Sequence, residues 1–322
     1  MKSESGTSEL IVRVSKKDEI ADGIFMFELR SHEGTELPAF TAGSHITVST
    51  PSGQKRRYSL CNDSSERDRY VIAIKQEKNG RGGSLSFTRD VNVGDVVSVE
   101  APANEFEMSA AEPRNYIFVA GGIGITPIRS MILQCVRNGK QNFKLFYFAR
   151  TPEMMAFREE FEAAAFAQTV VLHNDNGDRD QAYDLWPILE EQKGAHLYCC
   201  GPRGLMDSVR DMTGHWPETA VHFEDFGVGT TSKPDDKPFE VKLARSGNVY
   251  TVDVGASILD TLRVHGHELA SSCESGTCGT CRVRFTDGTP DHRDLVLSDK
   301  EQKNEIMICV SRAKSASITL DI

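Results

Sequence analysis

Four cysteines near the C-terminus have a spacing that could hold an iron–sulfur cluster. Cys273, Cys278 and Cys281 form the pattern C-x4-C-x2-C, and 27 residues separate Cys281 from Cys309. This is the spacing of the plant-type [2Fe–2S] site, in which one tight loop supplies three thiolates and a distant strand supplies the fourth. A zinc site is the alternative, but structural zinc sites usually pair two short Cys or His spacings, and Cys309 has no such neighbour. The spacing therefore predicts a [2Fe–2S] cluster bound by these four residues.

The segment Arg56-Arg57-Tyr58-Ser59 carries the kinds of group that a flavin requires. On a strand, alternate side chains share a face, so Arg56 and Tyr58 would point one way and Arg57 and Ser59 the other. Tyr58 could form an apolar wall for the flavin ring, Arg56 could pair with the phosphate, and Ser59 could hydrogen-bond near ring atom N5. A basic turn that closes a hairpin is the alternative interpretation.

A glycine-rich turn, Arg81-Gly82-Gly83-Ser84, opens a short predicted helix. The free N–H groups at a helix N-terminus bind phosphate, and Arg81 would add a positive charge. The turn therefore predicts a phosphate site that would complete a flavin site together with Arg56. A flexible loop is the alternative.

A second glycine-rich loop has the character of a nucleotide-binding turn. Gly121, Gly122 and Gly124, followed by Thr126 and Pro127, come directly after an apolar strand and open a helix. Glycines at this place let the backbone approach a pyrophosphate closely. The loop is not the G-x-G-x-x-G fingerprint, because Pro127 takes the place of the third glycine. This argues against the nucleotide site of a standard dehydrogenase.

Two later segments contain further candidate site residues. Cys200-Gly201-Pro202 ends a strand predicted over 196–200, and Phe226 closes the region in which strands and helices alternate. The alternatives are a thiol and an aromatic ring that only fill the core, because cysteine and phenylalanine are both often buried.

These motifs lie in regions with different sequence patterns. Region 1–110 has short strands separated by turn sequences, which is typical of a small barrel. In 111–226 apolar strands alternate with helices, which indicates a parallel sheet covered by helices. Segment 227–237 has almost no apolar residues and is predicted to be a linker. Because 238–322 combines strands, a short helix and the cysteine loop, we expect a multidomain chain with an antiparallel β-barrel domain, an α/β parallel-sheet domain and an α+β domain.

The composition of the 322-residue chain limits its partners and its compartment. Hydrophobic residues make up 39% and charged residues 26%, as in ordinary globular proteins. A formal net charge of −10 repels phosphate backbones and anionic lipids, so neither nucleic acid nor a membrane is an expected partner. The first ten residues lack the apolar core of a signal peptide. The expected location is the cytoplasm, where cysteines stay reduced or bind metal.

Taken together, the motifs resemble those of the phthalate dioxygenase reductase family, which contains FMN and a plant-type [2Fe–2S] ferredoxin domain. The likeness covers nearly all of the chain, and blocks 58–63 and 272–279 match almost letter for letter. The resemblance implies FMN rather than FAD, NADH as the electron donor, and a monomer. It implies that Ser59, Cys200 and Phe226 lie at the reacting rings. The residues that it implies for binding flavin and nicotinamide are Arg56, Arg57, Tyr58, Ser59, Ala73, Ile74, Lys75, Arg81, Gly82, Gly83, Ser84, Gly121, Gly122, Gly124, Thr126, Pro127, Cys200, Gly201, Pro202 and Phe226.

The resemblance also implies an electron relay. NADH would deliver a hydride to FMN, and single electrons would pass through the [2Fe–2S] cluster to the oxygenase component of a Rieske-type aromatic dioxygenase such as phthalate dioxygenase. One alternative is the same relay serving a different oxygenase or a demethylase. Another is a non-catalytic iron–sulfur sensor, for which NADH would reduce no external acceptor.

Overall fold

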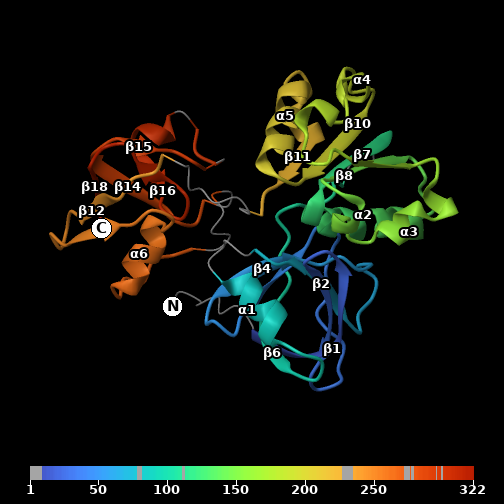
Figure 1. Ribbon diagram of the computed structural model, residues 1–322, viewed down its shortest axis with the longest axis horizontal. Helices are drawn as coiled ribbons and strands as arrows, with labels where there is room; N and C mark the ends of the chain where they lie inside the picture. Colours follow the sequence, from blue (N-terminus) through green and yellow to red (C-terminus); the bar gives the residue numbers. More distant parts are fainter. Residues whose placement is uncertain are drawn as a thin grey trace. The chain divides into compact units, whose positions relative to one another are not determined.

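A computed structural model divides the chain into two compact units, residues 1–224 and 225–322. Figure 1 shows the helices and strands of each unit in chain order. No helix in the described part of the chain is both long enough and apolar enough to cross a membrane. The residues that the structure describes are 9–77, 82–110, 113–226, 235–271, 276, 279–294, 296–298 and 300–322.

The first part of unit 1 is an antiparallel barrel. Its six strands have the order β4-β3-β6-β1-β2-β5, and an antiparallel bridge between Leu60 and Ile72 joins the chain after β4 to β5. Along β1, Val12 and Val14 are fully buried while Arg13 between them is exposed, which is the alternation that a half-buried strand requires. The predicted barrel is confirmed. The bounds are β1 (Glu9–Ala21), β2 (Ile24–Ser31), β3 (His45–Ser49), β4 (Lys55–Ser59), β5 (Tyr70–Lys75), α1 (Gly83–Asp90) and β6 (Val96–Glu100).

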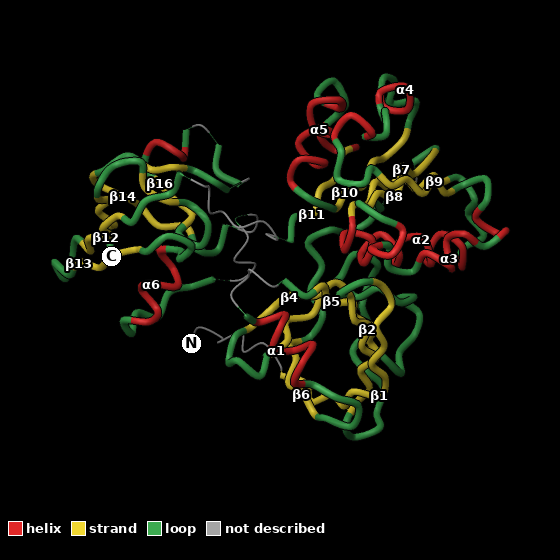
Figure 2. The backbone as a smooth tube through the Cα atoms, viewed as in Figure 1, coloured by secondary structure: helices red, strands yellow, loops and turns green. Residues whose placement is uncertain are grey.

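The second part of unit 1 is a parallel sheet with the strand order β11-β10-β7-β8-β9. Apart from its first residue, strand β7 is buried along its whole length, as expected for a strand covered on both faces. Helices α2 and α3 lie on one side of the sheet and α4 and α5 on the other (Figure 2). The bounds are β7 (Asn115–Gly121), α2 (Ile125–Arg137), β8 (Phe143–Ala149), α3 (Arg158–Glu162), β9 (Val170–Asn174), α4 (Trp186–Leu189), β10 (Ala195–Cys200), α5 (Arg203–Thr213) and β11 (Val221–Glu224).

Helix α2 holds the barrel against the parallel sheet. Arg129 Nη1 donates a hydrogen bond of 2.6 Å to the carbonyl oxygen of Cys61, and the Ser130 hydroxyl donates one of 2.8 Å to the carbonyl oxygen of Asn62. Both carbonyls belong to the loop directly after β4. The end of β4 is therefore fixed relative to the edge of the sheet from which α2 begins.

Unit 2 contains a mixed five-stranded sheet with the order β13-β12-β18-β14-β16, in which only the β12–β18 pairing is parallel. Helix α6 begins after Ser257, whose hydroxyl accepts a 3.0 Å hydrogen bond from the N–H of Asp260 and so caps the helix. The bounds are β12 (Phe239–Leu243), β13 (Val249–Val252), α6 (Ile258–Val264), β14 (Arg282–Asp287), β15 (Pro290–Asp291), β16 (Glu305–Met307), β17 (Arg312–Ala313) and β18 (Ser317–Leu320). Short 3-10 turns are η1 (Gly122–Gly124), η2 (Pro152–Met154), η3 (Ala164–Phe166), η4 (Arg179–Gln181), η5 (Glu218–Ala220) and η6 (Glu301–Lys303).

Candidate flavin, nicotinamide and iron–sulfur sites

Strand β4 presents Tyr58 toward helix α1 with an unsatisfied hydroxyl group. The centroid of the Tyr58 ring lies 6.1 Å from that of Phe87 on α1. The hydroxyl is buried and has no hydrogen-bond partner among the described residues. Because an unpaired buried hydroxyl costs free energy, this position fits a ligand that supplies a polar group.

Arg56 lies against the first turn of α1. A Cβ atom on Gly83 would come within 2.8 Å of Arg56 Nε, so the Arg56 side chain lies directly on the backbone of this turn. Gly82, directly before the helix, has a φ of 87°, which is left-handed backbone that favours glycine. The first N–H groups of a helix have no partner within the helix, and a guanidinium beside them makes an anion site. This geometry fits the phosphate of a flavin.

The Ser59 hydroxyl meets a side chain from the end of the parallel sheet. Ser59 Oγ, at the end of β4, donates a hydrogen bond of 3.4 Å to Glu224 Oε2 at the end of β11. The parallel pairing of β10 with β11 sets Cys200 directly beside Glu224. Ser59 and Cys200 are buried, and Glu224 is half-buried. The site therefore joins a hydroxyl and a carboxyl group, and Cys200 lies on the strand next to that carboxyl group.

The carboxyl group of Glu224 favours its neutral form. Burial raises the pKa of Glu224 to about 8, although the Arg57 cation and the hydrogen bond from Ser59 act to lower it. Glu105 acts in the same direction as burial because a second carboxylate repels negative charge. Arg57 is itself held by an ion pair of 2.8 Å from Nη2 to Glu105 Oε2, and the same atom lies 3.1 Å from His45 Nδ1. Near pH 7 the site therefore contains a protonated acid.

The predicted nucleotide loop packs directly on the Cys200 turn. A Cβ atom on Gly121 would lie 2.5 Å from Pro202 Cδ, and one on Gly201 would lie 2.9 Å from the nitrogen of Gly121. A Cβ atom on Gly124 would overlap the carbonyl oxygen of Cys200. Glycine is thus required on both sides of this contact. The loop that could bind a pyrophosphate and the turn that follows Cys200 therefore pack together at the carboxyl ends of β7 and β10.

In unit 2, two of the four predicted cluster ligands lie within the described residues. Cys281 and Cys309 are both buried in the core of the unit. The N–H of Ile308 donates a 3.3 Å hydrogen bond to the carbonyl oxygen of Cys281, which holds the two ligand segments side by side. Cys273 and Cys278 lie outside the described residues. Thiolates from separate segments are the donor set that a [2Fe–2S] cluster takes, so the described half of the site fits that group.

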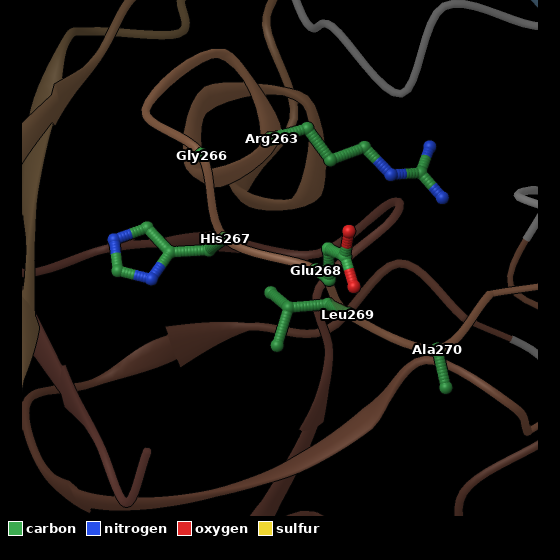
Figure 3. A pocket seen from close by; sticks show the side chains of 6 residues that line it. All are labelled: Arg263, Gly266, His267, Glu268, Leu269 and Ala270. Atoms are coloured by element: carbon green, nitrogen blue, oxygen red, sulfur yellow. The ribbon is translucent and has the colours of Figure 1, made fainter.

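A hollow of about 530 Å³ lies elsewhere in unit 2 (Figure 3). It is formed where the chain leaves α6 and runs toward the cysteine loop, and Figure 3 shows the side chains of Arg263, His267 and Glu268 around it. The His267 ring is hydrogen-bonded to the hydroxyl of Tyr250 at 2.9 Å. The hollow includes none of the side chains predicted for the flavin, the nicotinamide or the cluster. The remaining lining residues are Gly266, Leu269 and Ala270.

Family models cover most of the chain. The model of the oxidoreductase FAD-binding domain matches residues 4–108, that of the oxidoreductase NAD-binding domain matches 118–211, and that of the 2Fe-2S iron-sulfur cluster binding domain matches 241–314.

Full-length relatives carry the same arrangement. The chain is 53% identical to the phthalate 4,5-dioxygenase oxygenase reductase subunit of Pseudomonas putida, with 97% of this chain and 96% of that protein covered. It is 49% identical to the phthalate dioxygenase reductase of Burkholderia cepacia, with 97% of each covered. A solved structure of phthalate dioxygenase reductase superposes with a TM-score of 0.84, at 48% identity over 98% of each chain. This chain belongs to the phthalate dioxygenase reductase family. It is an electron-transfer reductase with flavin-binding, NAD-binding and [2Fe–2S] domains, as the motifs predicted.

The three residues of β5 that were predicted to contact flavin differ in their exposure. Ile74 lies in the barrel core, so only its backbone could meet a flavin ring. Ala73 is also buried, whereas the exposed Lys75 forms an ion pair of 3.0 Å with Glu77. Contacts of these three residues with flavin stay a prediction.

Several other predicted residues of the reductase have structural partners of their own. The Thr126 hydroxyl donates a 2.9 Å hydrogen bond to the carbonyl oxygen of Ile123 and so stabilises the nucleotide loop from within. The buried Pro127 lies in the first turn of α2, where proline is favoured. The Ser84 hydroxyl accepts a 3.1 Å hydrogen bond from the N–H of Glu77.

The contacts predicted for Arg81 and Phe226 are not tested by the structure. Arg81 lies outside the described residues. Phe226 is half-buried and stands at the start of unit 2, so its predicted contact with the flavin ring stays a prediction.

Sequence analysis missed Glu224. The residue lies two positions before Phe226, at the end of β11, a strand that sequence analysis did not predict; in parallel sheets ligands bind at the carboxyl ends of the strands. Its position beside Cys200 depends on which strand pairs with β10, and no local pattern contains that information. A signal was nevertheless present, because an acidic residue at a strand end near a predicted nicotinamide site is a candidate functional group.

Proposed function

We propose that this reductase binds FMN, takes electrons from NADH, and passes them through a [2Fe–2S] cluster to the oxygenase component of a Rieske-type aromatic dioxygenase acting on phthalate or a closely related aromatic acid. It works as a monomer in the cytoplasm, where thiol ligands stay reduced. The observation that carries the proposal is the convergence of Ser59, Cys200 and Glu224 at one site, in a chain 53% identical to a phthalate 4,5-dioxygenase reductase subunit.

The contacts around β4 support FMN. Arg56 and the N-terminus of α1 would hold a terminal phosphate, and the buried Tyr58 hydroxyl would gain a hydrogen-bond partner. A doubly charged phosphate at the end of a flavin matches a guanidinium placed beside free N–H groups. A bound flavin would accept a hydride from the nicotinamide and release electrons singly to the cluster.

The side chains at the end of β4 would orient the reacting rings. The Ser59 hydroxyl would lie near ring atom N5, and the small Cys200 thiol would let the nicotinamide approach closely. The neutral Glu224 holds its proton beside Ser59 and keeps an uncompensated negative charge out of the site where the flavin gains electrons. The packed loops at Gly121 and Gly124 would hold the pyrophosphate on the same surface.

Sequence identity favours the phthalate system over a demethylase. The two phthalate reductases are 53% and 49% identical to this chain, whereas the vanillate O-demethylase oxidoreductase of Pseudomonas putida is 38% identical over a similar length. The same relay serving a demethylase is the second candidate. Turnover coupled to purified oxygenase components of each kind separates the two, because only the cognate component oxidises its substrate at the expense of NADH.

An anaerobic titration of the purified protein with NADH tests the relay. We expect the visible bands of flavin and cluster to bleach together, low-temperature EPR to show a reduced [2Fe–2S] signal, and FMN to be the flavin released on denaturation. Released FAD would contradict the FMN assignment. A cluster that dithionite reduces but NADH does not would contradict the nicotinamide assignment and support a sensor.

A further inference from the structure

Four charged side chains form a buried group in unit 2. They are Asp236, Asp291, Arg293 and Arg312, and each side chain is at most 13% exposed. Two positive and two negative charges balance, so the group carries no net charge. A buried ion group of this kind is weak evidence for stability, because apolar side chains can do as well. A buried ionic group can instead fix one particular arrangement of the chain.

Arg293 joins two distant segments through this group. Its Nη1 atom donates a 2.9 Å hydrogen bond to Asp236 Oδ2 and its Nη2 atom bonds the other oxygen of the same carboxylate. Its Nε atom donates a 2.8 Å hydrogen bond to Asp291 Oδ2. In the short antiparallel pairing of β15 with β17, Asp291 and Arg312 are opposite each other on the two strands. Asp236 is thus tied to the body of unit 2 by a two-pronged, charge-assisted contact.

Arg312 fixes the backbone that follows Asp236. Its Nη2 atom donates a 3.1 Å hydrogen bond to the carbonyl oxygen of Lys237, and its guanidinium lies 4.9 Å from the centre of the Phe239 ring. The Nε atom of Arg312 is 3.6 Å from Asp236 Oδ2. The chain is therefore held to unit 2 from Asp236 onward, three residues before β12 begins. Asp235, one position earlier, is exposed.

The same short segment carries a cluster ligand. Arg312 follows Cys309 by three residues, and Val310 between them packs against Gly276: a Cβ atom on Gly276 would lie 2.6 Å from Val310 Cγ2. Gly276 is also close to Asp294, whose Cα would be 3.1 Å from that Cβ atom. The attachment of Asp236 thus lies within a few residues of the strand end that supplies Cys309.

We propose that Asp236 is a positioning residue for electron transfer within the chain: it fixes the end of the predicted linker, 227–237, onto the body of unit 2 beside the Cys309 segment. A linker fixed at Asp236 is shorter than one that is free up to β12. A shorter linker raises the effective concentration of the cluster at the flavin, its electron donor. The inference rests on the electron relay proposed above. It assigns no contact between the two units.

The test compares three variants of the full-length holoprotein. Asp236→Asn keeps the size of the side chain but removes the charge that Arg293 holds. Asp235→Asn removes a neighbouring exposed charge, and Asp291→Asn removes a charge from the same buried group without touching the linker. The measurements are hydrogen exchange of the peptide covering 235–243, iron content, the EPR spectrum of the reduced cluster, and stopped-flow rates for flavin and cluster reduction by NADH.

Asp236→Asn is expected to increase exchange at 235–239 while leaving iron content, the EPR spectrum and the flavin reduction rate unchanged. Electron transfer from flavin to cluster should slow by about 1.5-fold, because freeing three more residues lengthens a linker of about nine residues and the effective concentration falls as roughly the −3/2 power of linker length. Both control variants should keep the wild-type exchange at 235–239 and the wild-type rate. Equal exchange and equal rates for Asp236→Asn and Asp235→Asn would overturn the proposal. So would an Asp291→Asn variant that loosens 235–239 as much.

If Asp236→Asn does not retain iron, Arg312→Lys takes its place. Lysine keeps a cation beside Asp236 but cannot also reach the backbone carbonyls of Lys237 and Ala256, to which Arg312 donates at 3.1 and 2.6 Å. Increased exchange at 237–239 with an intact cluster signal would support the proposal, and wild-type exchange would overturn it. Failure of the relay itself is recognised separately, since NADH would then not reduce the cluster of the unaltered protein.

Discussion

Ser59 and Glu224 lie 165 positions apart, yet the Ser59 hydroxyl donates a hydrogen bond of 3.4 Å to Glu224 Oε2. The contact joins the last residue of β4 in the barrel to the last residue of β11 in the parallel sheet. The hydrogen bonds from α2 to the loop after β4 hold these two strand ends in place. A flavin bound along β4 and a nicotinamide bound at the sheet edge would therefore meet beside a group that can hold a proton.

The protonation of Glu224 gives a prediction for the pH dependence of flavin reduction. Burial raises the pKa of Glu224 to about 8, so the protonated form predominates below that pH and the carboxylate above it. A carboxylate would oppose the arrival of electrons at the flavin. The rate of flavin reduction by saturating NADH, measured by anaerobic stopped flow, should be level below about pH 7 and fall as the pH passes about 8.

Glu224→Gln supplies the control for this prediction. Glutamine has a similar shape, accepts the hydrogen bond from Ser59 and cannot ionise. The variant should keep a rate near that of the wild type below about pH 7 and lose the fall at higher pH. A variant whose rate still falls with the wild-type midpoint would show that another group titrates.

Arg57 and Glu105 should move the midpoint of this pH profile in opposite directions. Arg57 lowers the pKa of Glu224, so Arg57→Gln should shift the midpoint to higher pH. Glu105 raises that pKa and also pairs with Arg57, so Glu105→Gln should shift it to lower pH. The same stopped-flow series measures both. Shifts of the same sign would mean that the two substitutions act through a structural change instead of through charge.

Local patterns predicted the parts of this site but not how they meet. The alternation along 56–59 predicts Arg57 on the Ser59 side of the strand, and both residues act on the carboxyl group of Glu224, because the period of a strand is a local property. The cysteine spacing likewise reflects one loop and its ligands. In contrast, the packing of Gly124 on the Cys200 carbonyl follows from the adjacency of β7 and β10, which are separated by two intervening strands in sequence. Strand order is set by the whole sheet, so residues brought together by it, such as Glu224, escaped sequence analysis.

Arg56 should be required for flavin retention. Removing a guanidinium that binds phosphate costs about 1.5–3 kcal/mol, so Arg56→Ala should weaken flavin binding by about tenfold to a hundredfold. Fluorescence of free flavin after dilution of the holoprotein measures this loss. Lys55→Ala is the matched control, because Lys55 pairs with Glu100 at 2.7 Å on the exposed surface and should leave flavin binding unchanged. Equal flavin retention in both variants would contradict the phosphate site.

Gly124→Ala should weaken NADH binding without releasing flavin. A Cβ atom at this position would overlap the backbone oxygen of Cys200, so the nucleotide loop and the Cys200 turn would have to move apart. Overpacking of this kind typically costs about 1–3 kcal/mol, and the dissociation constant for NADH should rise by about tenfold. Gly204→Ala, at the start of α5, has no neighbouring atom within 4 Å of its Cβ position and should bind NADH as the wild type does. The dissociation constants come from the dependence of the flavin reduction rate on NADH concentration. Wild-type affinity in Gly124→Ala, with flavin content unchanged in both variants, would mean that the loop does not contact the nucleotide.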